Sequence, residues 1–262
     1  MTRSPELSVP PVEWRDLTPL QPWERVKELL LPVPWLALSL GLAGRRWDPL
    51  ALAASFLFFL AGLRLVHDVF HHNLGLGRTA NHLVLVTLSV VMLGSMHAIR
   101  LTHLHHHRYC LGEDDIEASS ARLSAWGALV SGPVFPVRLH LAAWRLATPR
   151  HRWWIGAELA LTAVTLTLVF GMLDVPILRY HAAAMAGGQC LTAFFAVWTV
   201  HHDCDGRPFA RTLRNRLKSA VAMDMFFHVE HHLFPRVPTC RLGRLAERLD
   251  RVAPELSRQQ VY

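Results

Sequence analysis

The sequence has few of the residues that build disulfide frameworks or thiolate metal sites. Its four cysteines are scattered along 262 residues and form no CxxC pair. They are Cys110, Cys190, Cys204 and Cys240. This spacing predicts neither a disulfide scaffold nor a zinc site built from cysteines, and it suits a reducing, cytosolic environment.

Charged residues are also scarce. Only 18% of the residues are charged, whereas 52% are hydrophobic. This balance lies at the apolar edge for a soluble protein, so we expect the chain to be embedded in a membrane. The net charge of +7 comes from basic residues that flank apolar segments, and no nucleic-acid-binding motif accompanies them. We therefore expect no nucleic-acid partner.

Three common signatures of enzymes and electron carriers are missing. The sequence contains no HExxH, no GxGxxG and no His-Pro-Gly-Gly. These absences argue against a zinc protease helix, a dinucleotide-binding fold and a fused cytochrome b5 domain. Residues 1–27 are polar and carry Glu6, Glu13, Asp16 and Glu24, so no secretory signal is expected there. We predict a cytosolic N-terminal segment over 1–27 and a single domain over 28–262.

Four apolar segments approach the roughly 20 residues that a membrane-spanning helix requires. They cover residues 28–44, 49–66, 153–173 and 176–200. Proline and polar residues occupy 44–49 and 173–176, which predicts a tight turn inside each pair. Pro32 and Pro34 indicate that the first span starts late or tilts. The sequence thus predicts an all-α integral membrane protein with four transmembrane helices in two hairpins.

Three histidine clusters recur along the chain: HDVFHH at 67–72, HLHHH at 103–107 and HVEHH at 228–232. Residues three and four apart are neighbours on a helix, so each cluster can converge on one point, and only His105 falls off its face. Imidazole binds iron, zinc, copper and nickel, and about eight nitrogens exceed one four-coordinate site, which favours two metal ions over solvated or core histidines. The candidate ligands are His67, His71, His103, His106, His107, His228, His231 and His232.

The clusters can meet only if they lie on one side of the membrane. We therefore interpret the apolar run 82–99 as a re-entrant or interfacial helix, and treat 126–144 likewise because prolines and basic residues interrupt it. Residues 67–152 and 201–262 then form a cytosolic cap. Residues 1–27, 67–152 and 201–262 hold 4, 8 and 11 of the 27 Lys and Arg residues. This excess predicts a multi-pass protein of the inner, cytoplasmic membrane whose termini and metal site face the cytosol.

The remaining histidines are expected to be structural, hydrogen-bonded side chains. They are His82, His97, His140, His151 and His181. The tail 242–256 reads as an amphipathic helix whose apolar face comprises Leu242, Leu245, Leu249 and Val252.

At these motifs the chain resembles the membrane fatty acid desaturase and hydroxylase superfamily, which also contains carotenoid ketolases and hydroxylases. The resemblance covers His67 to about Leu249 and is most specific at HVEHHLFPRVP, residues 228–238. It implies two iron ions (Fe2+/Fe3+), held by eight or nine histidines at the cytosolic ends of four membrane helices, with O2 as co-substrate. The ninth ligand would be His201 or His202, and the sequence does not choose between them.

Acidic residues lie within or beside the clusters. Ligating histidines usually donate their second ring N–H to a carboxylate, and this role is expected of Asp68, Asp114, Asp115 and Glu230, and also of Glu113 and Glu117 in the same acidic run. Asp224 stands four residues before His228, where many members of the superfamily have asparagine. This spacing lets Asp224 approach the metal or accept a histidine N–H.

The resemblance implies desaturation of an acyl chain of a lipid, with electrons from a separate donor of the ferredoxin or cytochrome b5 type. Hydroxylation or ketolation of a lipid or carotenoid is the alternative, and a membrane zinc hydrolase or a non-enzymatic metal-binding protein belongs to another class. A basic segment is a possible docking site for an acidic donor, an acyl headgroup or anionic lipid. It comprises Arg207, Arg211, Arg214, Arg216 and Lys218.

Overall fold

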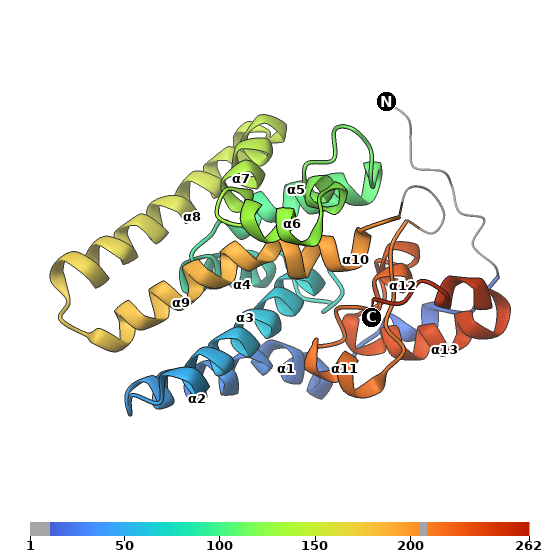
Figure 1. The fold of residues 1–262 in the computed structure, drawn as a ribbon, viewed down its shortest axis with the longest axis horizontal. Coiled ribbons are helices and arrows are strands. Elements are labelled where there is room, and N and C mark those ends of the chain that lie inside the picture. Colours follow the sequence, from blue (N-terminus) through green and yellow to red (C-terminus); the bar gives the residue numbers. More distant parts are fainter. Residues whose placement is uncertain (1–10, 205–208, 262) are drawn as a thin grey trace.

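The computed structural model describes residues 11–204 and 209–261, and every extended regular element in these ranges is helical (Figure 1). The only β-type pairing among them is an isolated bridge between Thr212 and Gln260. The predicted all-α class is therefore confirmed for the described chain.

Four helices are long and apolar enough to cross a membrane, and they coincide with the four predicted spans. They cover Pro22–Ala43, Asp48–Phe70, Pro149–Met172 and Pro176–His201. The first contains α1 (Pro22–Leu30) and α2 (Pro32–Ala43), and the second is α3 (Asp48–Phe70). The third contains α8 (Pro149–Thr167) and η3 (Leu168–Met172). The fourth contains α9 (Pro176–Thr192), η4 (Ala193–Trp198) and α10 (Thr199–His201).

The first span begins earlier than predicted. Glu24 accepts a hydrogen bond from the backbone N–H of Gln21 at 2.8 Å, and the reciprocal bond completes a capping box that starts α1. Pro32 opens α2 at its first turn, where a missing N–H costs nothing. The prolines therefore divide the span without shortening it.

The run 82–99 is not one straight helix. It is divided between α4 (Arg78–Met92) and α5 (Met96–Tyr109), whose axes differ by 108°, as in a broken span or a re-entrant loop. A carboxylate from α8 holds this bend, because Glu158 accepts hydrogen bonds from the Ser95 hydroxyl at 2.6 Å and from the backbone N–H of His97 at 3.1 Å. The bend gives α5, which carries the second histidine cluster, a different direction from α4.

The segment 126–144 forms two short helices, α6 (Ala125–Ser131) and α7 (Phe135–Leu146). They are separated at Gly132, where a Cβ atom would lie 1.9 Å from the carbonyl oxygen of Cys190 on α9. Only glycine permits this close approach. It brings α7 against α5 and α9, where it borders the site described below.

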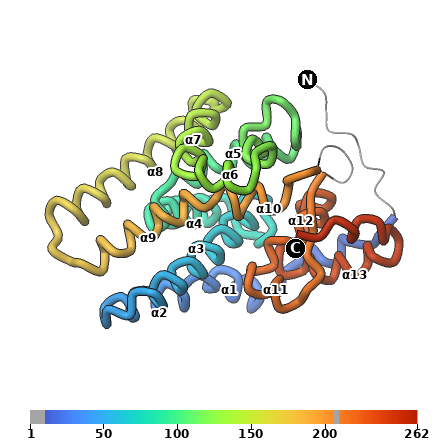
Figure 2. The backbone as a smooth tube through the Cα atoms, viewed as in Figure 1, coloured from blue at the N-terminus to red at the C-terminus, as the bar shows by residue number. Residues whose placement is uncertain are grey.

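The C-terminal part consists of α11 (Arg216–Val221), α12 (His228–Leu233) and α13 (Leu242–Val252). Helix α13 buries Leu242, Leu245 and Leu249 as predicted, but Val252 is 48% exposed and Ala246 completes the buried face instead. Val252 is the last residue of the helix, so the chain leaves the packed surface there. In Figures 1 and 2, the segment that precedes α1 passes behind α13, where Arg248 donates to Asp16 at 2.7 Å.

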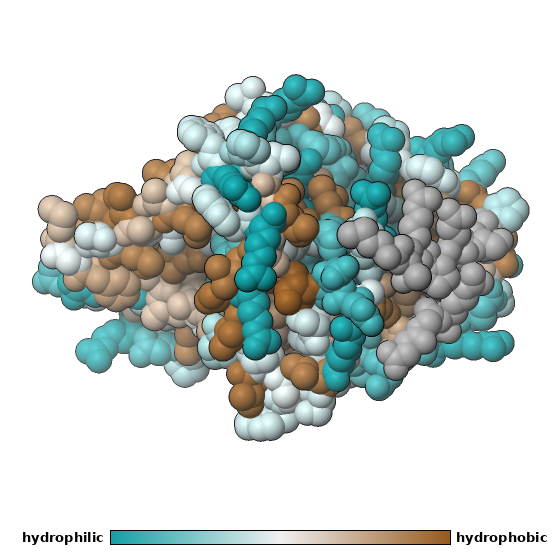
Figure 3. Space-filling model, turned by 90° about the horizontal axis from the view of Figure 1, so that it is seen from above, coloured by the Kyte–Doolittle hydropathy of each residue, from teal (hydrophilic) through white to brown (hydrophobic). Residues whose placement is uncertain are grey.

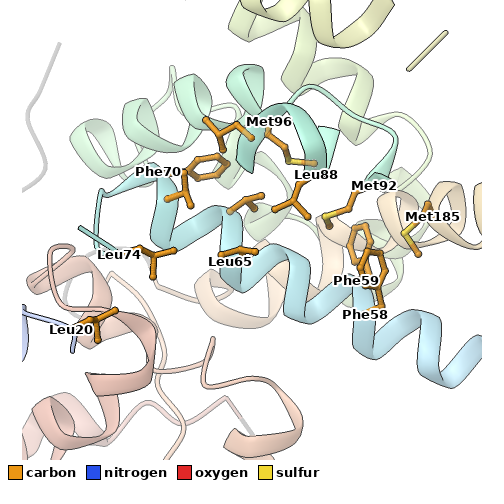
Figure 4. Packing of buried hydrophobic residues seen from close by; sticks show 13 residues of the cluster. Leu20, Phe58, Phe59, Leu65, Phe70, Leu74, Leu88, Met92, Met96 and Met185 are labelled. Atoms are coloured by element: carbon orange, nitrogen blue, oxygen red, sulfur yellow. The ribbon is translucent and has the colours of Figure 1, made fainter. Parts of the chain in front are cut away.

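The largest cluster of buried hydrophobic residues lies between α3, α4 and α5, and Figure 4 shows Leu65 and Phe70 of α3 directed toward Leu88 and Met96. It holds the end of α3 against α5, and both helices carry histidine clusters. Hydrophobic residues gather at the molecular surface over the end formed by the turn between η3 and α9, whereas hydrophilic side chains are frequent at the other end (Figure 3). The surface therefore suits a protein with one end in lipid.

Candidate metal centre

Among the described residues, nine histidines from α3 and its C-terminal end, from α5, from α10 and from α12 meet in two sets. Within each set, one ring nitrogen of every member lies within 4.8 Å of the corresponding nitrogens of the others. The five-histidine set comprises His67, His71, His103, His107 and His231. The four-histidine set comprises His106, His201, His228 and His232. All eight histidines predicted from the three clusters belong to one set or the other.

The sets cut across the sequence clusters. His103 and His107 belong to the five-histidine set, whereas His106 between them belongs to the four-histidine set. Likewise, His228 and His232 belong to the four-histidine set and His231 does not. The expectation that each cluster converges on one point is wrong for these two clusters, because adjacent residues of a helix diverge by about 100°. Helices α5 and α12 therefore each serve both sets.

The ring nitrogens converge closely. In the five-histidine set, the Nε2 atom of His103 lies 3.0 Å from that of His71 and 3.1 Å from that of His107. In the four-histidine set, the Nε2 atom of His201 lies 3.1 Å from that of His106 and 2.9 Å from that of His228. Ligands bound to one ion at about 2.1 Å lie about 3 Å apart when their bonds are at right angles. The donor sets therefore fit metal ions.

Four histidines outside the membrane spans are held in the neutral form that binds metal. Burial lowers the pKa of His107, His228, His231 and His232 well below the usual value, and neighbouring imidazoles lower it further. His106 differs from them. Burial also disfavours its charged form, but a hydrogen bond to Asp115 outweighs burial, so the pKa of His106 lies well above its usual value.

Two carboxylates of the acidic run after the second cluster orient histidines. The Nδ1–H of His106 donates to Asp115 at 2.7 Å, and that of His103 donates to Glu117 at 2.9 Å. Asp115 also accepts the backbone N–H groups of Leu111 and Ala118, so both of its oxygens accept hydrogen bonds. These contacts direct the Nε2 atoms toward the sets, as orienting acceptors of metal-binding histidines do.

Three other predicted acids have different surroundings. Asp114 is exposed, although the adjacent Asp115 is buried. Asp68 accepts hydrogen bonds from the backbone and hydroxyl of Thr239, both at 3.0 Å. Glu230 is fully buried; it pairs with Arg214 at 2.7 Å and accepts a hydrogen bond from Thr212. Contrary to expectation, the described contacts of Asp68 and Glu230 hold the protein around the clusters and do not include a histidine.

The structure distinguishes His201 from His202. His201 lies in the four-histidine set and donates its Nδ1–H to the carbonyl of Phe209 at 2.9 Å. His202 stacks on Trp198 with ring centroids 3.9 Å apart, and its Nδ1 contacts the Trp198 carbonyl at 2.8 Å. Helix α10 ends at His201, and the backbone of His202 is already extended. His202 lies outside both sets.

Asp224 also lies outside both sets. It accepts hydrogen bonds from Arg64 at 3.3 Å and from Ser219 at 3.0 Å. Arg64 is buried within α3 and pairs with Glu28 of α1 at 2.7 Å. This network, which the sequence analysis missed, joins the first two spans to the segment that precedes α12. The sequence signal for this network is Arg64 itself, a lone arginine in an apolar run three residues before His67. A charged residue within a membrane span is retained only with a partner.

The five histidines expected to be structural are hydrogen-bonded away from the sets. His97 pairs with the buried Glu158 at 2.6 Å, and its other nitrogen lies 2.8 Å from His82. His140, His151 and His181 contact the Ser95 N–H, the Thr148 hydroxyl and the Val91 carbonyl, respectively. In each case the ring serves local structure.

The predicted basic segment is only partly free. Arg207 lies outside the described residues. Arg211 donates to the carbonyls of His202 and Gln260, and Arg214 pairs with Glu230 and Asp250. Lys218 is exposed, as is Arg216, which contacts Glu247 at 3.3 Å. Two of its arginines therefore stabilise the fold itself.

A cavity of about 100 Å³, which we call the reaction cavity, reaches both histidine sets. His67 and His103 of the five-histidine set and His228 of the four-histidine set line one part of it, and Glu117 lies beside them. The remaining lining residues are Leu63, Val66, Phe70, Met96, Ile99, Phe135, Pro136, Leu139, Gln189, Thr192, Ala196, Val197 and Met225. The cavity can hold an apolar chain against both sets. Sequence spacing did not identify its walls, because they come from helices whose facing sides only the packing determines.

The family comparison agrees with this geometry. The family model described as fatty acid desaturase matches residues 45–261, which include all nine histidines. No curated protein and no solved structure matches the chain. The family typically binds two iron ions, and the two histidine sets are compatible with a metal at each. The chain belongs to the fatty acid desaturase family.

Proposed function

We propose that this protein is an O2-dependent di-iron oxidase that desaturates an acyl chain of a lipid, with electrons from a separate donor of the ferredoxin or cytochrome b5 type. The observation that carries the proposal is an apolar cavity lined by histidines of both sets. A protein that only stores or carries metal needs no such cavity. When bound, the iron ions supply activation of O2 and removal of hydrogen from an unactivated C–H bond.

The side chains have separate roles in this proposal. The five-histidine set holds one iron and the four-histidine set holds the other. Asp115 and Glu117 fix the tautomers of His106 and His103, so that each Nε2 lone pair points at the metal. Asp68 and Glu230 act indirectly, because their contacts with Thr239 and Arg214 hold the segments that carry the first and third clusters.

The cavity positions the substrate. Its aliphatic and aromatic walls exclude water and fix one part of an apolar chain beside His67, His103 and His228. The position of one methylene decides whether a second hydrogen is removed or an oxygen atom is added. Acyl desaturation is favoured because residues 228–238 resemble acyl desaturases, while hydroxylation or ketolation is the alternative outcome at the same site.

We further propose that the four candidate spans form two membrane hairpins whose histidine-bearing ends face the cytosol. Short connections at 44–47 and 173–175 join the spans within each pair. The excess of Lys and Arg in 1–27, 67–152 and 201–262 supports this orientation in a cytoplasmic membrane. The separate electron donor would then approach from the cytosol.

The test is expression in cells together with a ferredoxin and its reductase, followed by mass spectrometry of the cellular lipids. A desaturated product carries two hydrogens fewer than its substrate lipid, whereas a hydroxylated product carries one additional oxygen. We expect the product to vanish in His106→Ala and to persist in His202→Ala, a matched control outside both sets.

Metal analysis of the same purified proteins separates the other classes. Iron in the parent supports the oxidase, whereas zinc alone with no change in any lipid indicates a membrane hydrolase. If His106→Ala and the parent give the same lipid profile, the oxidase proposal is wrong.

A further inference from the structure

A second cavity lies on another face of α5 from the reaction cavity. It measures about 230 Å³ and is bordered by α4, α5 and the beginning of α8, next to the end of α3. Three arginines, Arg78, Arg100 and Arg150, line it together with four histidines. No carboxylate is among its lining residues. We call it the basic cavity.

The arginines of the basic cavity have no acidic partner among the described residues. None of them takes part in an ion pair there, and the guanidinium of Arg100 contacts only His72, at 2.8 Å. The Nε atom of Arg100 is buried without a hydrogen-bond partner. The nearby Glu158 already pairs with His97 at 2.6 Å and accepts from Ser95 at 2.6 Å. A buried donor without an acceptor is costly, and three arginines that share a cavity without a carboxylate favour an anion as the missing acceptor.

The position of the cavity identifies the kind of anion. Arg150 and Trp154 lie in the first turns of one candidate span, and Val69 lies at the end of another. Trp154 stacks on His82 with ring centroids 4.5 Å apart, and its neighbour Trp153 is 64% exposed. Tryptophans at the ends of spans mark the headgroup level of a bilayer.

Exposed apolar side chains on the helices that border the basic cavity offer contacts for lipid chains. Leu83 on α4 is 63% exposed and, like Trp153 on α8, belongs to a helix that borders the cavity. An amphiphile whose polar group occupied the basic cavity could lay its chains along these two side chains. A basic recess beside lipid-facing residues attracts anionic lipid, with about 1 kcal/mol for each Lys or Arg.

The basic cavity is separate from the reaction cavity. Met96, Ile99 and His103 of α5 line the reaction cavity, whereas His97 and Arg100 line the basic cavity on another face of the same helix. We propose that the basic cavity binds the phosphate of an anionic phospholipid headgroup as a site distinct from that of the substrate chain. The bound lipid would join α4, α5 and α8 at the bend that aims the second histidine cluster.

The test uses the purified full chain in detergent, with native mass spectrometry and thermal unfolding. The variant is Arg78→Gln/Arg150→Gln, which removes two exposed arginines. The matched control is Arg138→Gln/Arg145→Gln, which removes the same charge from exposed positions of α7. Equal metal content in parent, variant and control verifies that each is folded.

We expect the parent and the control to retain one phosphatidylglycerol and to be stabilised by it. The variant should bind it about 30-fold more weakly, which corresponds to about 2 kcal/mol. Equal binding by variant and parent overturns the proposal. It is likewise overturned if phosphatidylcholine binds as tightly as phosphatidylglycerol, or if inorganic phosphate alone stabilises the parent as much as the lipid does.

Discussion

The buried hydrogen bond between Asp115 and His106 gives the most specific prediction about the four-histidine set. The two side chains meet at 2.7 Å, and each is 1% exposed. In Asp115→Asn, the side chain keeps its shape, but an NH2 group replaces an oxygen that accepts an N–H. Asp115 accepts three N–H groups, from His106, Leu111 and Ala118, so one of them must face another donor. The tautomer and orientation of His106 are then no longer fixed.

Loss of such an orienting partner typically lowers metal affinity about 10- to 100-fold, which is about 1.4 to 2.7 kcal/mol. We expect Asp115→Asn to lose iron from the four-histidine set and to retain iron in the five-histidine set. Titration of the purified protein with Fe2+ against a competing chelator measures both affinities. The matched control is Asp114→Asn, an exposed neighbour of the same type. If the two variants bind iron equally well, the assignment of Asp115 as the orienting acceptor is refuted.

Three further predictions concern the surrounding structure. Arg64→Met should lower the free energy of unfolding by about 3 to 5 kcal/mol, because Glu28 is left buried and unpaired. Thermal unfolding measures this loss. The double variant Arg64→Met/Glu28→Leu, which removes both charges, should recover the lost stability. Thr192→Trp should abolish the lipid product, because the indole fills the reaction cavity, while the iron content stays at the parental level. An unchanged amount of product would exclude this cavity as the substrate site. The metal-free protein should lose stability as the pH falls below about 6.5, because unfolded imidazoles take up protons that the buried His228 and His231 do not. Denaturant unfolding at neutral and mildly acidic pH measures this loss of stability, and a constant stability would contradict it.

Helical spacing and charge predicted much of the molecule. Apolar segments of the right length located the four candidate spans, and their ends were wrong mainly at Pro22, where a capping box extends the first helix. The spacing of histidines identified eight of the nine residues that meet in the two sets. Two of the expected acidic contacts are present, because Asp115 contacts His106 and Glu117 contacts His103.

Other features depend on how distant helices pack, which no local pattern encodes. The division of α5 and α12 between two sets follows from where their partners stand around them. The sequence does not distinguish His201 from His202. Only the end of α10 between them places His201 in the four-histidine set and leaves His202 outside it. Asp224 has a suitable spacing to His228, but Arg64 on α3 takes its carboxylate instead. Such choices become visible only when helices far apart in sequence are placed together.

The central claim is that nine histidines hold two irons in two distinct sets. The most direct measurement is iron and zinc content per chain in the parent, in His107→Ala of the five-histidine set and in His232→Ala of the four-histidine set. The account predicts two irons in the parent and a selective loss of one iron in each variant. Zinc in place of iron in the parent, or variants with an unchanged iron content, would contradict it.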